Sequence, residues 1–170
     1  LATVIDGPAG PQPDVRIVLM KRHDAEGFLF FGNFESAKGR QLAAVPRAAL
    51  DFHWKSPRRQ VRVAGPVVPA SAAIADAYFA TRPRASQLSA WASDQSRALD
   101  DRATFETRLA TMDARFPSDV PRPPFWGGLR LVPHRIEFWE ERAGRQHHRD
   151  LFVTGAGPDG AGWTHTLLYP

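Results

Sequence analysis

Residues 136–149 read I-E-F-W-E-E-R-A-G-R-Q-H-H-R, a stretch in which a strand pattern runs into a group of cationic side chains. Apolar and other residues alternate over residues 136–139, as in a β-strand that buries one face and presents the other. Beyond a polar turn at residues 143–144, an extended segment would place Arg145, His147 and Arg149 on one face. Two guanidiniums beside an imidazole favour an anionic, planar ligand, and a solvated basic hairpin accounts for the same pattern equally well.

Short strand patterns recur on both sides of this stretch. A hairpin is predicted over residues 15–32, because two apolar runs flank the turn at residues 24–27. A Gly- and Pro-rich loop is predicted over residues 7–13, and a glycine-rich hairpin tip over residues 155–162. Further strands are predicted over residues 1–5, 48–54, 59–68, 129–132, 135–140, 151–154 and 163–168.

Helical patterns are confined to the middle of the chain. Ser36 is a suitable N-cap for a short helix that Pro46 would end. The apolar period changes to that of a helix over residues 71–81 and again over residues 101–116. Strands at both ends with helices between them predict a mainly β fold with helices, in which a small antiparallel barrel of roughly seven strands carries the helices outside it.

Composition limits the class of function. The 170 residues, 43% hydrophobic and 24% charged, predict one globular domain over residues 1–170. The net charge of +4 suits an anionic ligand, but the scattered Lys and Arg residues argue against nucleic acid. The lack of cysteine excludes disulfides and thiolate catalysis, and no metal-ligand spacing is present.

Targeting patterns are also missing from the sequence. No apolar run is long enough to span a membrane, and no signal-peptide pattern is present, so we expect a cytoplasmic protein without a membrane partner. Because the sequence does not begin with methionine, we expect a preceding N-terminal segment in the natural chain.

A second group of polar residues accompanies the predicted helix over residues 71–81. Tyr78 and Arg82 are four residues apart, hence neighbours on one helical face, and Ser86 follows them closely. A phenol, a guanidinium and a hydroxyl that converge near a helix end would hold a phosphate well. Taken by itself, this group is more typical of a surface helix cap with an ordinary arginine.

Seven segments, in order along the chain, resemble the pyridoxine (pyridoxamine) 5′-phosphate oxidase family. Together they cover nearly the whole sequence, and their agreement in register makes the resemblance specific. The segments are R-I-V-L-M-K (16–21), F-F-G-N-F-E-S-A-K (30–38), R-Q-V-R-V-A-G (59–65), Y-F-A-T-R-P-R-A-S-Q (78–87), A-W-A-S-D-Q-S (90–96), P-F-W-G-G-L-R (124–130) and residues 136–149.

The resemblance implies an FMN-binding split β-barrel that forms a homodimer, with FMN in clefts between the two subunits. The FMN ligands that it implies are Arg16, Ile17, Val18, Leu19, Met20, Lys21, Phe31, Gly32, Lys38, Gln60, Gln95, Ser96, Trp139 and Arg149. The residues that it implies for a phosphorylated pyridine substrate are Lys21, Tyr78, Arg82, Ser86, Arg145, Gln146 and His147.

The implied activity is the oxidation of pyridoxine or pyridoxamine 5′-phosphate to pyridoxal 5′-phosphate in vitamin B6 metabolism. In this family chemistry a hydride leaves the 4′ carbon of the substrate for the flavin, and dioxygen reoxidises the flavin to give hydrogen peroxide. Arg145 and His147 are the implied catalytic residues, with positioning and polarising roles.

Four departures from the family pattern leave other functions open. Ala37 replaces an arginine on the FMN phosphate, Gly32 replaces a hydroxyl residue, and His148 stands where an acidic residue is common. The C-terminus reads L-L-Y-P in place of R-L-x-P. One alternative is a related flavin oxidase that acts on a phenazine precursor, against which the phosphate group of residues 78–86 argues. Another is a non-catalytic protein that binds flavin or pyridoxal phosphate.

Overall fold

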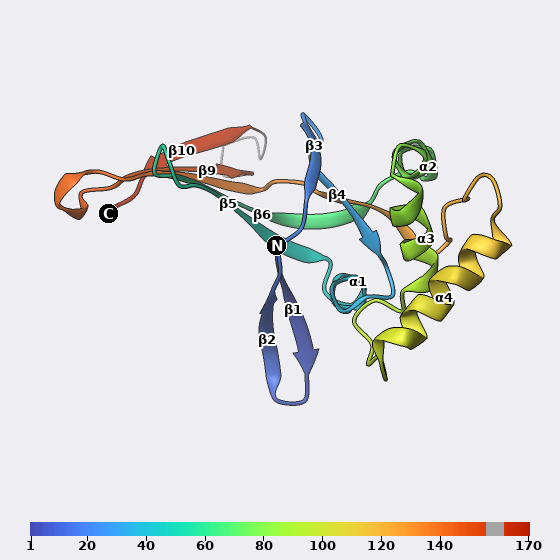
Figure 1. The fold of residues 1–170 in the computed structure, drawn as a ribbon. Helices are drawn as coiled ribbons and strands as arrows, with labels where there is room; N and C mark the ends of the chain where they lie inside the picture. The colour runs from blue at the N-terminus through green and yellow to red at the C-terminus, as the bar shows by residue number, and fades with distance from the viewer. Residues whose placement is uncertain (156–161) are drawn as a thin grey trace.

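Ten β-strands form the framework of the computed structural model, which describes residues 1–155 and 162–170 (Figure 1). All their pairings are antiparallel. The sheet runs in the order β10-β9-β8-β6-β5-β1-β2, and β3, β4 and β7 form a second branch. The strands are β1 (Ala2–Gly7), β2 (Gly10–Val15), β3 (Met20–Asp24), β4 (Gly27–Asn33), β5 (Arg47–Trp54), β6 (Arg59–Pro69), β7 (Trp126–Leu131), β8 (Arg135–Glu140), β9 (His148–Thr154) and β10 (Trp163–Leu167).

Strand β6 carries the chain from one branch of the sheet to the other. Its residues 59–64 pair with β8, and its residues 67–69 pair with β7. Between these two parts lies Gly65, where a Cβ atom would meet the carbonyl oxygen of Val132 at 1.9 Å. Glycine is therefore required for the close approach of the two backbones at this corner. The result is an open barrel whose two branches share one strand.

Of the four α-helices in the described residues, three begin where the sequence predicts a helix, and Ser36 is the predicted N-cap of the first. The side chains of Ser36, Ser71 and Asp101 accept hydrogen bonds from backbone N–H groups three residues later, at 3.3, 3.4 and 2.7 Å. Helices α2, α3 and α4 gather at the end of the molecule opposite the C-terminus (Figure 1). The helices are α1 (Ala37–Ala44), α2 (Ala72–Ala80), α3 (Arg84–Ala92) and α4 (Arg102–Arg115).

Helix α3 is not predicted from the sequence, where Pro83 reads only as the end of the preceding helix. In the structure Pro83 is the N-cap of α3, and its carbonyl oxygen accepts hydrogen bonds from the N–H groups of Ser86 and Gln87. Proline is compatible with the start of a helix, because a backbone N–H at that position has no helical acceptor. Leu88 and Ala92 then bury one face of α3.

Two other stretches correct the sequence prediction. The predicted loop over residues 7–13 includes the first four residues of β2, which tolerates Pro11 and Pro13 because it is an edge strand. The predicted strand at residues 16–19 has no regular structure, and β3 begins only at Met20. Ile17 and Leu19 are 94% and 67% exposed, so the apolar run there does not reflect burial in a sheet. Most of the predicted hairpin tip at 155–162 lies outside the described residues.

Two apolar clusters stabilise the fold. One lies within the sheet and includes Phe30, Leu50 and Leu131. The other joins α2 and α3 to β7 through Phe79 and Trp126, whose rings meet edge to face at 5.1 Å. The prediction of a mainly antiparallel β protein with helices packed outside is confirmed, and the described part of the chain has ten strands instead of about seven. None of the helices in the described residues has the length and apolar character needed to cross a membrane.

Candidate active site

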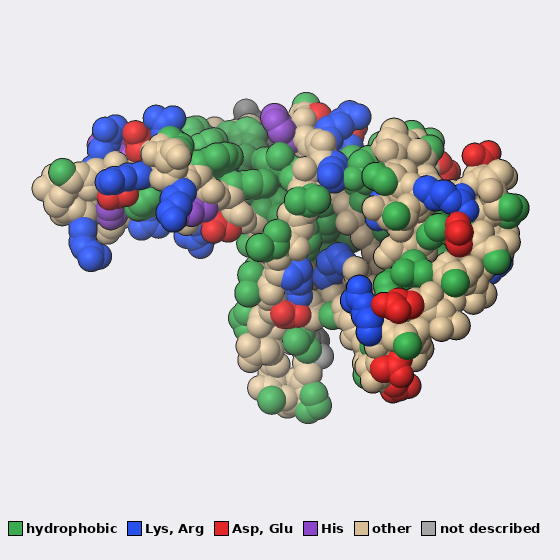
Figure 2. All heavy atoms as spheres, in the orientation of Figure 1, with side chains coloured by type: hydrophobic (Ala, Val, Ile, Leu, Met, Phe, Trp, Pro, Cys, Tyr) green, Lys and Arg blue, Asp and Glu red, His purple; other side chains and the backbone are tan. Residues whose placement is uncertain are grey.

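A cavity of about 940 Å³ lies between the segment that follows β2, strand β4 and helices α1 to α3. This volume is at the upper end of the range of about 300–1,000 Å³ for small-molecule sites. Lys and Arg side chains gather beside the notch between the β1–β2 hairpin and the helices (Figure 2). Among the residues predicted from the sequence, those that line the cavity are Arg16, Ile17, Val18, Leu19, Lys21, Phe31, Gly32, Lys38, Tyr78, Arg82, Ser86, Gln95 and Ser96.

Arg82 brings a half-buried positive charge to the cavity. Its guanidinium lies 4.7 Å from the ring of Trp126 and 5.4 Å from that of Phe79. Its Nη1 nitrogen is buried, and no atom of the described residues accepts a hydrogen bond from it. Burial lowers the pKa of Arg82, and the nearby Tyr78 opposes this effect. A buried donor without an acceptor is costly, so this position is suited to an anionic ligand.

Aromatic rings form one wall of the cavity. Phe31 stacks on Tyr78 at 4.1 Å between ring centroids and on Trp126 at 5.5 Å. The Nζ of Lys21 lies 5.7 Å from the centroid of the Tyr78 ring. The pairing of β4 with β7 places Phe31 and Trp126 together, and α2 adds Tyr78. The arrangement provides flat surfaces and a cation close to one another.

Lys38 occupies another part of the cavity wall. Its Nζ donates hydrogen bonds to Oε1 of Gln95 at 2.7 Å and to Oγ of Ser36 at 3.1 Å. Burial, together with the charge of Arg16, lowers the pKa of Lys38. A Cβ atom on Gly32 would lie 2.8 Å from Cε of Lys38, so the absence of a side chain at position 32 leaves room for the lysine.

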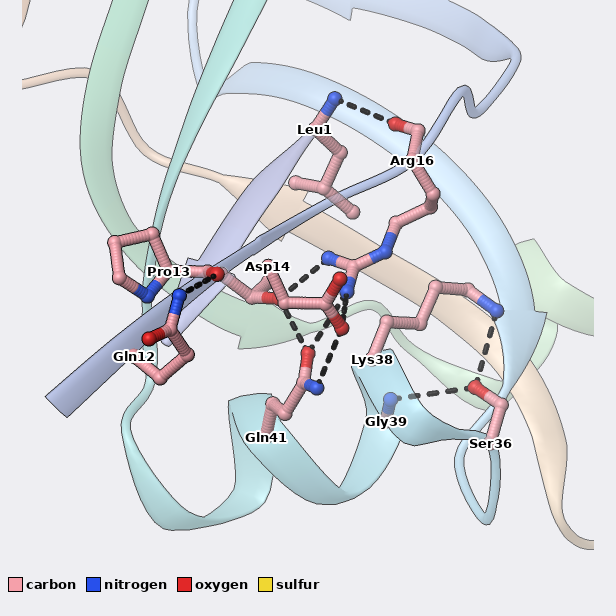
Figure 3. A network of polar contacts seen from close by, with 10 residues as sticks. Leu1, Gln12, Pro13, Asp14, Arg16, Ser36, Lys38, Gly39 and Gln41 are labelled. Carbon is pink, nitrogen blue, oxygen red and sulfur yellow. Dashed lines mark hydrogen bonds and ion pairs between the residues drawn. The ribbon is translucent and has the colours of Figure 1, made fainter. Parts of the chain in front are cut away.

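Arg16 is held by groups of the chain itself (Figure 3). Its guanidinium donates to Oδ2 of Asp14 at 2.5 Å, to Oε1 of Gln41 at 2.9 Å and to Oγ1 of Thr3. The hydrogen bond from Gln41, and then the charge of Arg16, lower the pKa of Asp14 despite partial desolvation. Asp14 therefore balances the charge of Arg16.

The other cations of the cavity have no such balance. Within residues 1–155 and 162–170, Lys21, Lys38 and Arg82 make no ion pair with a carboxylate. A site with three such cations attracts a ligand that carries negative charge.

Three predicted FMN ligands lie outside the cavity and form a row across the sheet. Gln60 of β6 pairs with Trp139 of β8, which pairs in turn with Arg149 of β9. Residues that pair across antiparallel strands point to the same face, so the three side chains are neighbours on one face. None of them lines the 940 Å³ cavity. Met20 is also absent from it and lines a separate cavity of about 430 Å³.

The connection between β8 and β9 carries Arg145, Gln146 and His147, which also lie outside the cavity. Figure 1 shows this connection at the end of the sheet farthest from α2 to α4. The predicted extended segment is wrong here: residues 143–145 form a 3₁₀ turn, and Arg145 has a left-handed φ of 60°. Nδ1 of His147 accepts a hydrogen bond from the Arg142 N–H at 3.3 Å, and its ring lies 4.7 Å from that of Trp139.

Comparison with known proteins shows the family to which the chain belongs. Residues 1–116 match the family model described as pyridoxamine 5′-phosphate oxidase. The chain belongs to this family. Residues 126–170 match a second model, the C-terminal dimerisation region of pyridoxine 5′-phosphate oxidase.

Curated relatives of this oxidase-family chain cover nearly its whole length. The pyridoxine/pyridoxamine 5′-phosphate oxidase of Sphingopyxis alaskensis is 58% identical over 160 residues, which are 94% of this chain and 72% of that protein. The protein of the same name from Hyphomonas neptunium is 59% identical over an alignment of 172 positions, which covers 100% of this chain and 76% of that protein. The expectation of an oxidoreductase of an FMN-dependent family is confirmed by these relatives.

Solved structures agree with the fold of the family. The chain resembles PhzG from Burkholderia lata 383, crystallised with tetrahydrophenazine-1-carboxylic acid, with a TM-score of 0.88 and 29% identity. The match covers 99% of this chain and 81% of PhzG. An FMN-binding protein from Nostoc punctiforme, related to pyridoxamine 5′-phosphate oxidase, has a TM-score of 0.74 at 20% identity over 99% of this chain and 85% of that one. The predicted split-barrel fold is confirmed.

Other residues of the oxidase-family cavity are not predicted from the sequence. Ser89, Ala90 and Ser93 line it together with the predicted Ser86, at helical spacing on one face of α3 and its C-cap. The spacing of these small residues at i, i+3, i+4 and i+7 could have identified them from the sequence, but only if α3 had been recognised as a helix. The remaining unpredicted residues of the wall are Asp14, Val15, Asn33, Ala37, Thr81, Pro83 and Trp126.

Proposed function

We propose that the chain is an FMN-dependent oxidase that converts pyridoxine or pyridoxamine 5′-phosphate to pyridoxal 5′-phosphate, with dioxygen as the electron acceptor. The observation that carries this proposal is the half-buried Arg82, whose buried Nη1 has no acceptor among the described residues and whose guanidinium lies over Trp126 in a 940 Å³ cavity. A phosphate oxygen is the acceptor best suited to a buried guanidinium. Tyr78 and Ser86 line the same cavity and add hydroxyl groups for the same phosphate.

The donors of the cavity also fit FMN. Lys38 is a cation without a carboxylate partner among the described residues, and it suits the phosphate of the cofactor. Gln95 has an amide that suits the uracil-like edge of a flavin, which needs donors and acceptors. When bound, FMN supplies the hydride acceptor, and dioxygen restores its oxidised form with release of hydrogen peroxide.

The separation of the row formed by Gln60, Trp139 and Arg149 from the cavity supports a homodimer. In one chain these side chains lie elsewhere on the sheet, and in a twofold dimer a second copy brings the row to the cavity. The match of residues 126–170 to a dimerisation region agrees with this arrangement. We propose that each flavin site takes its phosphate ligands from one subunit and the row from the other.

The dimer also provides a place for the proposed catalytic residues. Arg145 and His147 lie on the β8–β9 connection, between Trp139 and Arg149 of the row, so a second copy would bring them to the substrate as well. We propose that they orient the pyridine ring and polarise its substituents. Oxidation of the alcohol removes a hydride and a proton, and the amine substrate in addition takes up water and releases ammonia.

A peroxide assay tests the activity. Purified protein supplied with FMN is expected to release one hydrogen peroxide for each pyridoxal 5′-phosphate formed from pyridoxamine 5′-phosphate. Bleaching of the flavin absorption on substrate addition without oxygen reports the same electron transfer. Protein that binds FMN but turns over neither phosphorylated substrate contradicts the proposal.

Subunit complementation tests the shared site. The single variants Arg82→Met and Arg149→Met are each expected to be nearly inactive, because each impairs both sites of its own homodimer. After unfolding and refolding as an equal mixture, half of the dimers are mixed and each has one intact site, so about a quarter of the wild-type activity returns. A mixture as inactive as the separate variants shows that both residues act within one subunit.

The similarity to PhzG supports a second candidate, the oxidation of a phenazine precursor. Ala37 and Gly32 remove two groups that the family uses toward FMN, while the fold follows PhzG with a TM-score of 0.88. The phosphate-binding arrangement around Arg82 favours the first candidate, because an unphosphorylated substrate leaves this guanidinium unpaired. Turnover of pyridoxamine 5′-phosphate compared with pyridoxamine separates the two, since only a phosphate-binding site prefers the former.

A further inference from the structure

Glu137 of β8 is a buried carboxylate among three arginines. Its side chain is 2% exposed, and its two oxygens have different partners. Oε1 accepts a hydrogen bond from Nε of Arg149 at 2.9 Å and forms an ion pair with its Nη2 at 2.8 Å. Oε2 lies 3.3 Å from Nη1 of Arg62 and 3.4 Å from Nη2 of Arg135. The two-nitrogen contact with Arg149 is therefore the shortest interaction of this carboxylate.

Arg149 is also held from a second side. Its Nη1 donates to the backbone carbonyl of Tyr169 at 3.0 Å. A guanidinium has five N–H donors, and these contacts use one on each of its three nitrogens. Within the described residues, one donor therefore remains on Nη1 and one on Nη2, in a fork of fixed geometry. Arg149 is 27% exposed, against 51% for Arg62 and 42% for Arg135, so its orientation is the most restricted of the three.

Glu137 lies on the same face of the sheet as the row formed by Gln60, Trp139 and Arg149. It is two residues from Trp139 on β8, and side chains two apart on a strand share a face. Glu137 is nevertheless outside the row itself, since its partners in register are Arg62 and Leu151. Its contact with the row is through Arg149.

We propose that Glu137 is a positioning residue, which orients the Arg149 guanidinium so that its two remaining N–H donors serve the bound flavin. This inference rests on the proposed function. Fixing a flexible arginine before the ligand arrives removes the entropic cost of ordering it from the binding step. If Glu137 only neutralised nearby charge, its three arginine partners would matter to a similar extent.

Four single variants of the full-length protein separate these roles. The dissociation constant of FMN is measured by flavin fluorescence for Glu137→Gln, Arg149→Lys, Arg62→Gln and Arg135→Gln. The first two are expected to weaken FMN binding by about tenfold or more, the effect of one charged hydrogen bond. The two controls remove the more exposed partners of Glu137, and we expect them to stay within about threefold of wild type.

Coupling and kinetics provide two further readouts. The double variant E137Q/R149K is expected to bind FMN no more weakly than the weaker single variant, because both changes remove the same interaction. At saturating FMN, the KM for pyridoxamine 5′-phosphate is expected to stay near the wild-type value in E137Q. Independent, additive losses in the double variant would show that Glu137 does not act through Arg149.

Each result decides one of the two proposals. Wild-type protein that binds no FMN overturns the proposed function. Wild-type protein that binds FMN, with E137Q equal to it or with R62Q and R135Q as weak as E137Q, overturns only the positioning role. If E137Q does not fold, the FMN affinity of R149K tests the inference instead, because this variant keeps the charge beside Glu137 but lacks the guanidinium fork. Unchanged FMN affinity in R149K overturns the inference.

Discussion

Replacement of Arg82 by methionine is expected to separate stability from ligand binding. Methionine keeps much of the length of the side chain and can pack against Trp126, but it carries no charge and no N–H donors. The folded protein without ligand should tolerate this change well, because the guanidinium has a buried Nη1 without an acceptor among the described residues. The affinity of the cavity for a phosphate group should decrease.

The magnitudes follow from the contacts of Arg82. Removing a buried, unpaired donor gains about 1–3 kcal/mol. Losing the contacts of the guanidinium with Trp126 and Phe79, at 4.7 and 5.4 Å, costs about 0.5–2 kcal/mol. The two effects nearly cancel, so the free energy of unfolding should change by no more than about 1 kcal/mol. The lost charged hydrogen bonds are worth about 1.5–3 kcal/mol, which weakens phosphate binding about 10- to 150-fold.

Urea unfolding and calorimetric titration with pyridoxal 5′-phosphate measure the two quantities on the same preparation. Arg84→Met is a matched control two residues away. Arg84 donates to Asp113 at 2.6 Å and to the backbone carbonyls of Phe116 and Ser118, which ties α3 to the end of α4. This control is expected to lose about 1 kcal/mol of stability and to keep the wild-type affinity.

The reverse pattern would refute the reasoning about Arg82. If R82M loses 3 kcal/mol or more of stability while its affinity for pyridoxal 5′-phosphate is unchanged, the guanidinium is a packing element of the helical cluster. The phosphate would then be held elsewhere in the cavity.

Three further predictions concern the corner of the sheet and two titratable groups of the cavity. Gly65→Ala should cost about 3 kcal/mol or more in urea unfolding, because its Cβ would meet a backbone oxygen at 1.9 Å, whereas Gly7→Ala, with nothing within 4 Å, should not. Asp14 has a pKa below its ordinary value of 3.8, so its stabilising contribution is complete above about pH 4 and is lost as the pH falls through the lower, folded-state pKa. Unfolding from pH 7 to pH 2 should therefore show a smaller acid loss for Asp14→Asn than for wild type. The pKa of Lys38 lies below its ordinary value of 10.5, so the affinity for FMN should begin to fall at a lower pH than an ordinary lysine would cause. The variant Lys38→Met should bind FMN more weakly at every pH, but its affinity should lack this alkaline decrease.

Local patterns in the sequence determined much of the secondary structure. The helices that begin after Ser36, Ser71 and Asp101 follow from side-chain caps three residues from their backbone donors. The strands at residues 47–54, 59–69 and 135–140 follow from alternation of apolar and polar side chains. Such interactions span a few residues, so the chain shows them wherever its neighbours allow.

The prediction of secondary structure from the sequence was wrong where a partner distant in the chain decides the local structure. Residues 10–15 form a strand because β1 offers an edge to pair with, although two prolines argue for a loop. Helix α3 has a weak pattern of its own, and it is stabilised by the burial of Leu88 and Ala92 against other elements. The apolar residues at 16–19 resemble a strand but line a cavity instead.

The candidate site shows the same division. Residue types and family motifs determined which side chains suit a phosphate or a flavin, and they grouped Arg82 correctly with Tyr78 and Ser86. Only the tertiary structure decided that Gln60, Trp139 and Arg149 form a separate row, and that Glu137 holds Arg149. Strand register brings Gln60 opposite Trp139 from 79 positions away in the chain, and such pairing depends on the whole sheet, which no short stretch of sequence encodes.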